Sequence, residues 1–160
     1  MPKIGYVADH LVIKGLQDWI NKSIDFTPIN IKQIELEELP KANPAMALFA
    51  EPGTYKEIIT IAGDFDVYFR FRVDFRGTAE DTKDRTGLLQ PFHYLADFFD
   101  IETRNKRFGE LHIGEGRKPI SVSMDSLPSK VAVDANKITT YTAFYQLKYE
   151  QETQLWTRKV

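Results

Sequence analysis

Hydrophobic and polar residues alternate over residues 65–76, and this is the clearest pattern in the chain. The stretch FDVYFRFRVDFR places six apolar residues at its odd positions. Its even positions carry Asp66, Tyr68, Arg70, Arg72, Asp74 and Arg76. A period of two is typical of a strand with one buried face and one polar face. We therefore predict a strand whose odd positions, including Phe69 and Phe71, are buried and whose even positions are not.

Helical spacing of apolar residues predicts two helices. The first is amphipathic and runs from residue 4 to about residues 21–23. The second is predicted to begin at a Thr78 N-cap, with acidic residues in its first turn, and to continue to about Phe99. Pro91 falls inside this pattern. We expect a kink or a break near Gln90, because proline lacks the backbone N–H that an inner turn requires.

The remaining apolar runs predict strands, several of them linked in hairpins. They comprise a bulged or divided strand within TPINIKQIELEELP (27–40), a short strand within NPAMALFAEPG (43–53), a hairpin turn at Ala62–Asp64, strands at Ile120–Met124 and Lys130–Val133, a turn at Asp134 and Asn136, and a last strand within KITTYTAFYQLKYE (137–150). Strands in hairpin-linked runs favour an α+β fold. We predict one domain over residues 1–160, with a mostly antiparallel or mixed sheet flanked by two helices, and a flexible tail at residues 151–160.

Composition narrows the class of protein. A chain of 160 residues with 42% apolar residues suits one globular domain with a core of its own. The net charge of −2 gives no indication of a nucleic-acid or anionic-membrane partner. No run of 18 apolar residues predicts a membrane span, and the N-terminal sequence does not resemble a secretory signal. The absence of cysteine excludes disulfides and thiolate chemistry and suits a reducing compartment.

Candidate catalytic and metal-binding residues are few. His93 and Asp97 lie four residues apart on the second predicted helix, so they could form a dyad or half of a metal site. A zinc site needs three or four ligands, and no second pair is evident, so a surface hydrogen-bonded pair is the simpler interpretation. No nucleophile elbow, phosphate-binding glycine loop or HExxH motif occurs. We predict that the protein is not an enzyme and has no cofactor and no bound metal.

Three segments could each be either an ordinary surface of the domain or a contact site for a partner. The polar face of residues 65–76 is either a solvated sheet surface with cross-strand ion pairs or a protein interface. The basic loop Arg104–Lys118 is either a solvated loop or a surface near DNA. Leu155 and Trp156 either fold back on their own domain or dock on another subunit.

The order of these segments resembles a family of phage proteins. The segments are YVADHLVIKGLQDWI, AMALFAEPG, VYFRFRVDFRG, a helix ending LADFFD, and SLPSKVAVDANKITTYTAFYQLKYEQ. Together they cover about residues 5–150. They resemble the minor capsid protein family of tailed bacteriophages of Gram-positive bacteria, a group similar to tail terminator proteins. The resemblance lies in segment order and strand chemistry, since there is no catalytic motif.

The resemblance implies a structural role at the neck of the virion. A ring of subunits, hexameric in tail terminators, would cap the tail tube and dock to head-completion proteins, after assembly in the host cytoplasm. The charged strand face would then contact neighbours in the ring, with no membrane partner and no specific nucleic-acid binding. One alternative is a head-completion or connector-type protein that lines the DNA channel. Another is a small α+β enzyme or ligand carrier that uses His93 and the aromatic strands.

Overall fold

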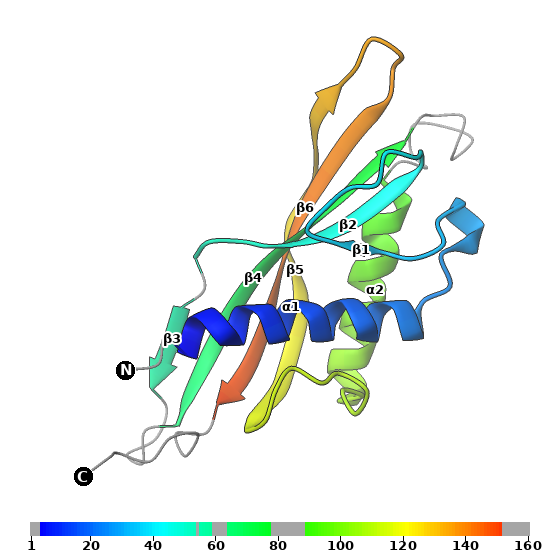
Figure 1. Cartoon of the computed structure of the whole chain (residues 1–160). Helices are drawn as coiled ribbons and strands as arrows, with labels where there is room; N and C mark the ends of the chain where they lie inside the picture. The colour runs from blue at the N-terminus through cyan, green and yellow to red at the C-terminus, as the bar shows by residue number, and fades with distance from the viewer. Residues whose placement is uncertain (1–3, 54, 59–63, 78–88, 152–160) are drawn as a thin grey trace.

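A mixed sheet and two helices build the fold, as the computed structural model shows (Figure 1). The structure describes residues 4–53, 55–58, 64–77 and 89–151. The elements are α1 (Ile4–Ser23), the 3-10 helix η1 (Thr27–Ile29), β1 (Glu35–Leu36), β2 (Ala45–Ala50), β3 (Tyr55–Ile58), β4 (Phe65–Gly77), α2 (Gln90–Asn105), β5 (Arg117–Val133) and β6 (Thr139–Gln151). The predicted α+β class is confirmed.

Strand β4 is the centre of the sheet. The strand order is β1-β2-β4-β6-β5, and β3 also pairs with β4. One edge of β4 pairs with β6 over its full length, whereas the other edge pairs with β2 over residues 71–76 and with β3 over residues 65–68. All these pairs are antiparallel, and only β1 pairs with its neighbour in parallel among the described strands. The mostly antiparallel, mixed sheet was therefore predicted correctly.

The core lies between the odd face of β4 and the two helices. Phe69 and Phe71 have no exposed surface, which confirms the predicted register, although Phe65 at the end of the strand is only half-buried. The ring of Phe71 stacks on Tyr145 of β6 at 5.5 Å between centroids and meets Phe99 of α2 edge-on at 6.0 Å. Both helices contribute to one cluster with this face: α1 through Val12, Ile13, Leu16, Trp19 and Ile20, and α2 through Phe92, Leu95 and Phe99. The helices therefore cover the same face of the sheet.

The second helix begins at the predicted break. Pro91 lies in the first turn of α2, where its missing N–H has no helical partner to lose. The helix continues to Asn105, and Lys106 ends it in a left-handed conformation with a φ of 53°. The predicted Thr78 N-cap and the residues that follow it lie outside the described part of the chain. Gln90 is thus the first residue of α2.

Two strand predictions were wrong in extent. The strand predicted within residues 27–40 is reduced to the two residues of β1, and a 3-10 turn precedes it. Ile29, Ile31 and Ile34 are buried because they pack into the core from an irregular segment, so their spacing reports burial and not a strand. The strands predicted at Ile120–Met124 and Lys130–Val133 are parts of one strand, β5, which has four register shifts against β6. These bulges broke the alternation on which the sequence prediction depended.

The turn between β5 and β6 was predicted correctly. Asp134 accepts hydrogen bonds from the backbone N–H groups of Asn136 at 2.8 Å and Ile138 at 3.0 Å. Lys137 has a φ of 62° and donates its N–H to the carbonyl of Asp134. Aspartate is favoured in such turns because its carboxylate can replace a backbone acceptor. The hairpin predicted around Ala62–Asp64 also forms, since β3 pairs with β4, although residues 59–63 of its turn lie outside the described residues.

Burial of Tyr145 makes stability depend on pH. Its hydroxyl donates to the carbonyl of Phe92 at 3.1 Å, and burial raises the pKa of Tyr145 above its ordinary value of 10.0. Above pH 10, the folded protein therefore keeps the proton on the Tyr145 hydroxyl, while the unfolded chain loses it. The contribution is complete below pH 10 and decreases above it by up to about 1.4 kcal/mol per pH unit. In chemical denaturation, Tyr145→Phe should lower stability by about 1 kcal/mol at pH 7 and show a shallower alkaline decline than wild type. Equal slopes would contradict this prediction.

Candidate interface on the open sheet face

The face of the sheet opposite the helices carries the polar row that the sequence indicated. The even positions of β4 lie directly across from Thr140, Thr142, Phe144, Gln146, Lys148 and Glu150 of β6, and Arg72 lies across from Phe49 of β2. Residues paired in this way share a face. No helix of the described residues covers these side chains, because the contacts of α1 and α2 are on the other side. We call this surface the open face.

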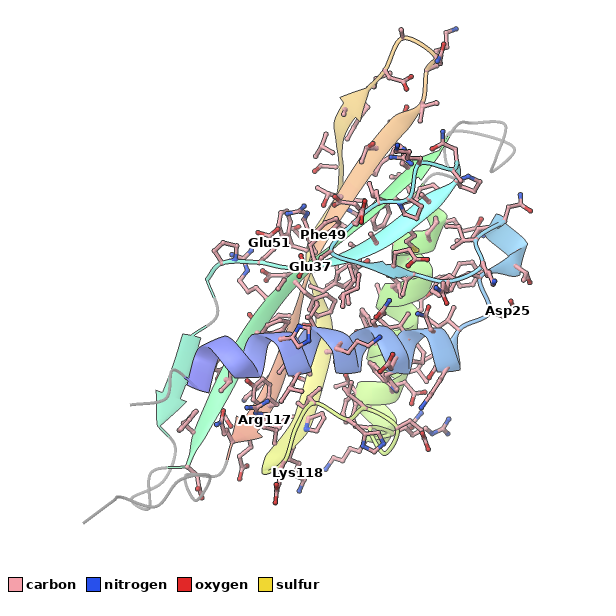
Figure 2. The ribbon with its side chains drawn as sticks, viewed as in Figure 1. Asp25, Glu37, Phe49, Glu51, Arg117 and Lys118 are labelled. Carbon is pink, nitrogen blue, oxygen red and sulfur yellow. The ribbon has the colours of Figure 1, made fainter. Side chains whose placement is uncertain are left out.

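Arg72 is at the centre of the open face and is held in place by its neighbours. It donates hydrogen bonds to Glu51 and, from Nε, to Asp74 at 3.2 Å. Its guanidinium lies 4.2 Å from the ring centroid of Phe49. Figure 2 labels Phe49 and Glu51 close together at the middle of the view, where the strands cross. Burial alone would lower the pKa of Arg72, but the two carboxylates outweigh it and raise the pKa, so this cation is fixed in position and charge.

The two aspartates of the row are buried, which corrects the prediction for the even positions. Asp66 is 7% exposed and Asp74 is 9% exposed. Asp74 accepts a hydrogen bond from the Thr142 hydroxyl at 2.6 Å as well as from Arg72. Asp66 forms an ion pair with Lys148 at 3.5 Å. Their short side chains keep the carboxylates close to the backbone of the sheet, where Arg72 and Thr142 contact Asp74 and Lys148 contacts Asp66. Alternation predicts which face a residue is on, but it does not give the exposed area.

The two remaining arginines differ in their surroundings. Arg76 donates from Nε to the side chain of Asn43 at 2.6 Å and from Nη2 to the carbonyls of Pro40 and Ala42. These hydrogen bonds hold the segment before β2 against β4. Arg70 pairs with Asp125 of β5 at 3.4 Å, and both side chains of this pair are more than a third exposed. Arg76 therefore has a structural role, whereas Arg70 presents its charge to the surface.

Cations and aromatic rings alternate across this face. Besides Arg72 over Phe49, Arg70 lies 5.7 Å from the Phe144 ring centroid, and the Lys148 ammonium lies 5.4 Å from that of Tyr68. Cation–π contacts hold both partners in defined orientations. Aromatic residues and arginine are enriched in protein interfaces. The open face thus presents guanidinium groups in defined orientations beside half-exposed aromatic rings.

The sequence also singled out residues away from the charged row of β4. Leu155 and Trp156 lie outside the described residues. His93 and Asp97 are both exposed on α2, and the described residues contain no group of three metal-ligating side chains. In the basic loop, Arg117 turns inward and donates to the carbonyl of Ile113 at 2.9 Å. Lys106 and Lys118 line a surface hollow of about 420 Å³ with Phe108, Gly109, Pro119, Ile120 and Glu150.

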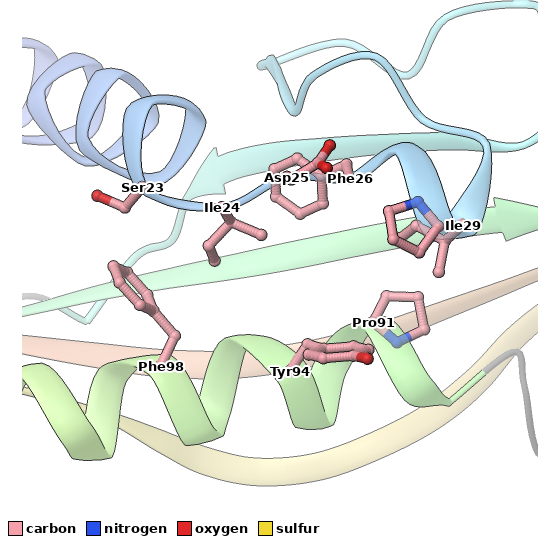
Figure 3. Close-up of a pocket in the computed structure, with 9 residues that line it drawn as sticks. Ser23, Ile24, Asp25, Phe26, Ile29, Pro91, Tyr94 and Phe98 are labelled. Atoms are coloured by element: carbon pink, nitrogen blue, oxygen red, sulfur yellow. The ribbon is translucent and has the colours of Figure 1, made fainter.

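Two surface features were not predicted from the sequence. One is an apolar pocket of about 270 Å³, lined by Ser23, Ile24, Asp25, Phe26, Pro28, Ile29, Pro91, Tyr94 and Phe98. Figure 3 shows Phe98, Tyr94 and Pro91 on α2 facing Ile24, Phe26 and Ile29 from the segment after α1. The other is the tip of the β5–β6 hairpin, where Leu127 is 76% exposed. The pocket is lined from two runs that each combine a proline with aromatic residues, 26–28 and 91–94, and this composition was the available sequence signal.

Among the described residues, no helix is both long and apolar enough to cross a membrane. No family model matches the chain, and a search of curated proteins finds no match either.

Proposed function

We propose that the chain is a non-enzymatic structural protein of a tailed phage, a tail terminator or minor capsid protein that assembles with copies of itself into a ring at the head–tail neck. The observation that carries this proposal is the open face, which no helix of the described residues covers and where arginines lie beside aromatic rings. The order of segments, which resembles that family, supplies the biological setting. The ring would cap the tail tube protein and dock to a head-completion protein.

The geometry of Arg72 supports protein recognition over a solvated surface. Binding costs side-chain entropy for every flexible group that becomes ordered at an interface. Glu51, Asp74 and Phe49 already hold Arg72 in one position, so less freedom remains to be lost. A planar guanidinium also retains donors for a carboxylate on a neighbour. The open face is therefore suited to repeated contacts between identical subunits.

The basic loop favours a second candidate, a head-completion or connector-type protein that lines the DNA channel. Lys106 and Lys118 approach the same hollow, and Arg104 and Arg107 are exposed nearby in sequence. Phosphate neutralisation by such residues would make binding strongly salt-dependent. A fluorescence-anisotropy titration with duplex DNA distinguishes the two: the ring proposal predicts no binding at physiological salt, and a salt-sensitive complex supports the channel protein.

Reversal of one exposed charge tests the ring directly. Arg70→Glu should cost the isolated subunit only about 1 kcal/mol, since Arg70 faces a single carboxylate in a pair that is more than a third exposed, and its contact with Phe144 is longer, at 5.7 Å, than that of Arg72 with Phe49. Across a subunit interface, the same change brings like charges together and costs up to several kcal/mol. Light scattering after size exclusion should show that the ring dissociates, while circular dichroism shows a folded subunit. Arg107→Glu, an exposed charge off the open face, is the matched control and should assemble normally.

Arg72 is a poorer probe of the interface than the sequence pattern suggested. A Glu at this position would face the carboxylates of Glu51 and Asp74 and would lose the contact with Phe49. Its cost to the subunit would therefore exceed that of a surface charge, and a loss of assembly would be ambiguous. The ring proposal is contradicted if wild type stays monomeric when concentrated and when mixed with tail tube protein, or if Arg70→Glu assembles like wild type.

A further inference from the structure

We propose that the tip of the β5–β6 hairpin in one copy of the chain docks into the apolar pocket of a second copy. The hairpin tip is defined as residues 125–138, and the pocket is the hollow between η1 and α2. This inference rests on the proposed function, because it names two surfaces that would meet in the ring.

The hairpin tip exposes apolar side chains to an unusual degree. Every residue from 125 to 137 except Pro128 is exposed. Seven large apolar side chains are exposed among the described residues, and three of them belong to this tip. These three are Leu127, which is 76% exposed, Val131 at 56% and Val133 at 53%. In Figure 1 the tip stands clear of both helices at the top of the view. Grouped apolar exposure of this kind marks an interaction site more often than scattered single residues do.

The backbone of the tip is poorly suited to pairing with another strand. β5 is an edge strand of the sheet, but it contains Pro119 and Pro128 and four register shifts. Prolines and bulges are the devices that prevent strand addition at an edge, because they remove donors and twist the strand. A partner therefore contacts the tip through side chains, and it requires a hollow rather than a second edge.

The pocket offers such a hollow with one charge at its lining. Its volume of about 270 Å³ is bounded mainly by aliphatic, aromatic and proline side chains. Asp25 is the single charged residue in the lining. Its carboxylate accepts hydrogen bonds from the Thr27 backbone N–H at 3.0 Å and hydroxyl at 2.8 Å, and these lower the pKa of Asp25. The pocket is thus apolar with a fixed negative charge.

The tip has the complementary arrangement of apolar and positive groups. Its acids are occupied, Asp125 by Arg70 and Asp134 by the amides of the turn. Lys130 lies between Leu127 and Val131 in the sequence and is exposed, and none of the ion pairs found among the described residues involves it. Insertion of Leu127 into the pocket would bury its apolar side chain, and it would place the positive charge of Lys130 near the negative charge of Asp25.

A second copy of the chain is the occupant that this pair of surfaces fits. Tip and pocket are different surfaces of one chain, so a contact between them joins copies head to tail. Head-to-tail contacts repeat from copy to copy and form a ring when the rotation closes. A two-fold dimer would make the same contact twice, with each tip in the other copy's pocket, whereas in a ring each copy gives its tip to one neighbour and its pocket to the other. The tip-and-pocket contact therefore gives the proposed ring its directional joint.

Cysteine cross-linking tests the contact without background, because the chain contains no cysteine. Leu127→Cys and Tyr94→Cys chains are mixed, oxidised mildly and separated on a non-reducing gel. A disulfide forms only where the Cα atoms come within about 7 Å. We expect a dimer of the two different chains in this mixture. His93→Cys, which is exposed beside Tyr94 but does not line the pocket, is the control and should give little product with Leu127→Cys.

A second variant measures the strength of the contact. Leu127→Asp should weaken self-association by about tenfold to hundredfold, because burial of a leucine would be lost. Ile101→Asp, which removes a 48% exposed apolar residue of α2 outside the pocket, should leave association unchanged.

Three outcomes would overturn the docking. They are equal cross-linking to Tyr94→Cys and His93→Cys, preferential linking of Leu127→Cys to itself, and no cross-linked product at high concentration. If wild type forms rings in any of these cases, only the docking fails and the proposed function remains. If wild type never assembles, the ring proposal fails by its own test.

Discussion

Replacement of Phe71 by alanine is expected to lower the free energy of unfolding by about 3–5 kcal/mol. The side chain is fully buried and contacts the rings of Tyr145 and Phe99, so its removal leaves a cavity that rigid aromatic neighbours fill poorly. Urea denaturation followed by circular dichroism measures this loss. Phe144→Ala is the matched control, since Phe144 lies half-buried on the open face and should cost much less. Equal losses at the two positions would show that the assignment of faces is wrong.

Replacement of Gly15 by alanine is expected to destabilise the protein, although alanine is the better helix former. In an exposed helix this change would stabilise by about 1 kcal/mol. Here a Cβ at Gly15 would lie 2.1 Å from the backbone carbonyl oxygen of His112 and 3.2 Å from the Ile113 side chain. The loop before β5 would have to move away from α1. Overpacking of this kind costs about 1–3 kcal/mol and occasionally more.

Gly109, which lies in the loop that Gly15 of α1 packs against, provides the control. A Cβ added there would meet nothing within 4 Å. Gly109→Ala should therefore be neutral or stabilise slightly, by up to about 1 kcal/mol through the unfolded chain. Thermal denaturation of both variants measures whether each substitution raises or lowers the melting temperature relative to wild type. A Gly15→Ala protein that is as stable as wild type, or more stable, would contradict the close approach of this loop to α1.

The regular part of the fold could be predicted because it follows simple periodicities. The alternation in residues 65–76 and 139–150 gave the two long central strands, since each has one face against the helices and one away from them. Helical spacing gave α1 in the same way. Local chemistry was sufficient for the turn at Asp134 and for the helix boundary at Pro91. These features depend on neighbours in the sequence.

Features that depend on distant residues could not be predicted. The burial of Asp74 involves Thr142 on the adjacent strand β6 as well as Arg72 of its own strand, and the sequence does not give the register that brings Thr142 beside it. The bulges of β5 interrupt its alternation, so the sequence predicted two short strands where the structure has one long strand. The apolar pocket requires η1 and α2, which are about sixty residues apart in the chain, to face each other. The candidate interface was thus predicted as a row of residues, and its internal pairing was not.

Cryo-electron microscopy of wild-type protein, alone and with tail tube protein, tests the proposed assembly most directly. We predict closed rings, hexameric by the resemblance to tail terminators, in which the open face and the hairpin tip lie at the boundary between neighbouring subunits. The joint should run head to tail, with Leu127 of each copy at the pocket of the next. Particles of single subunits under both conditions, or rings in which the open face remains solvated, would contradict the proposal.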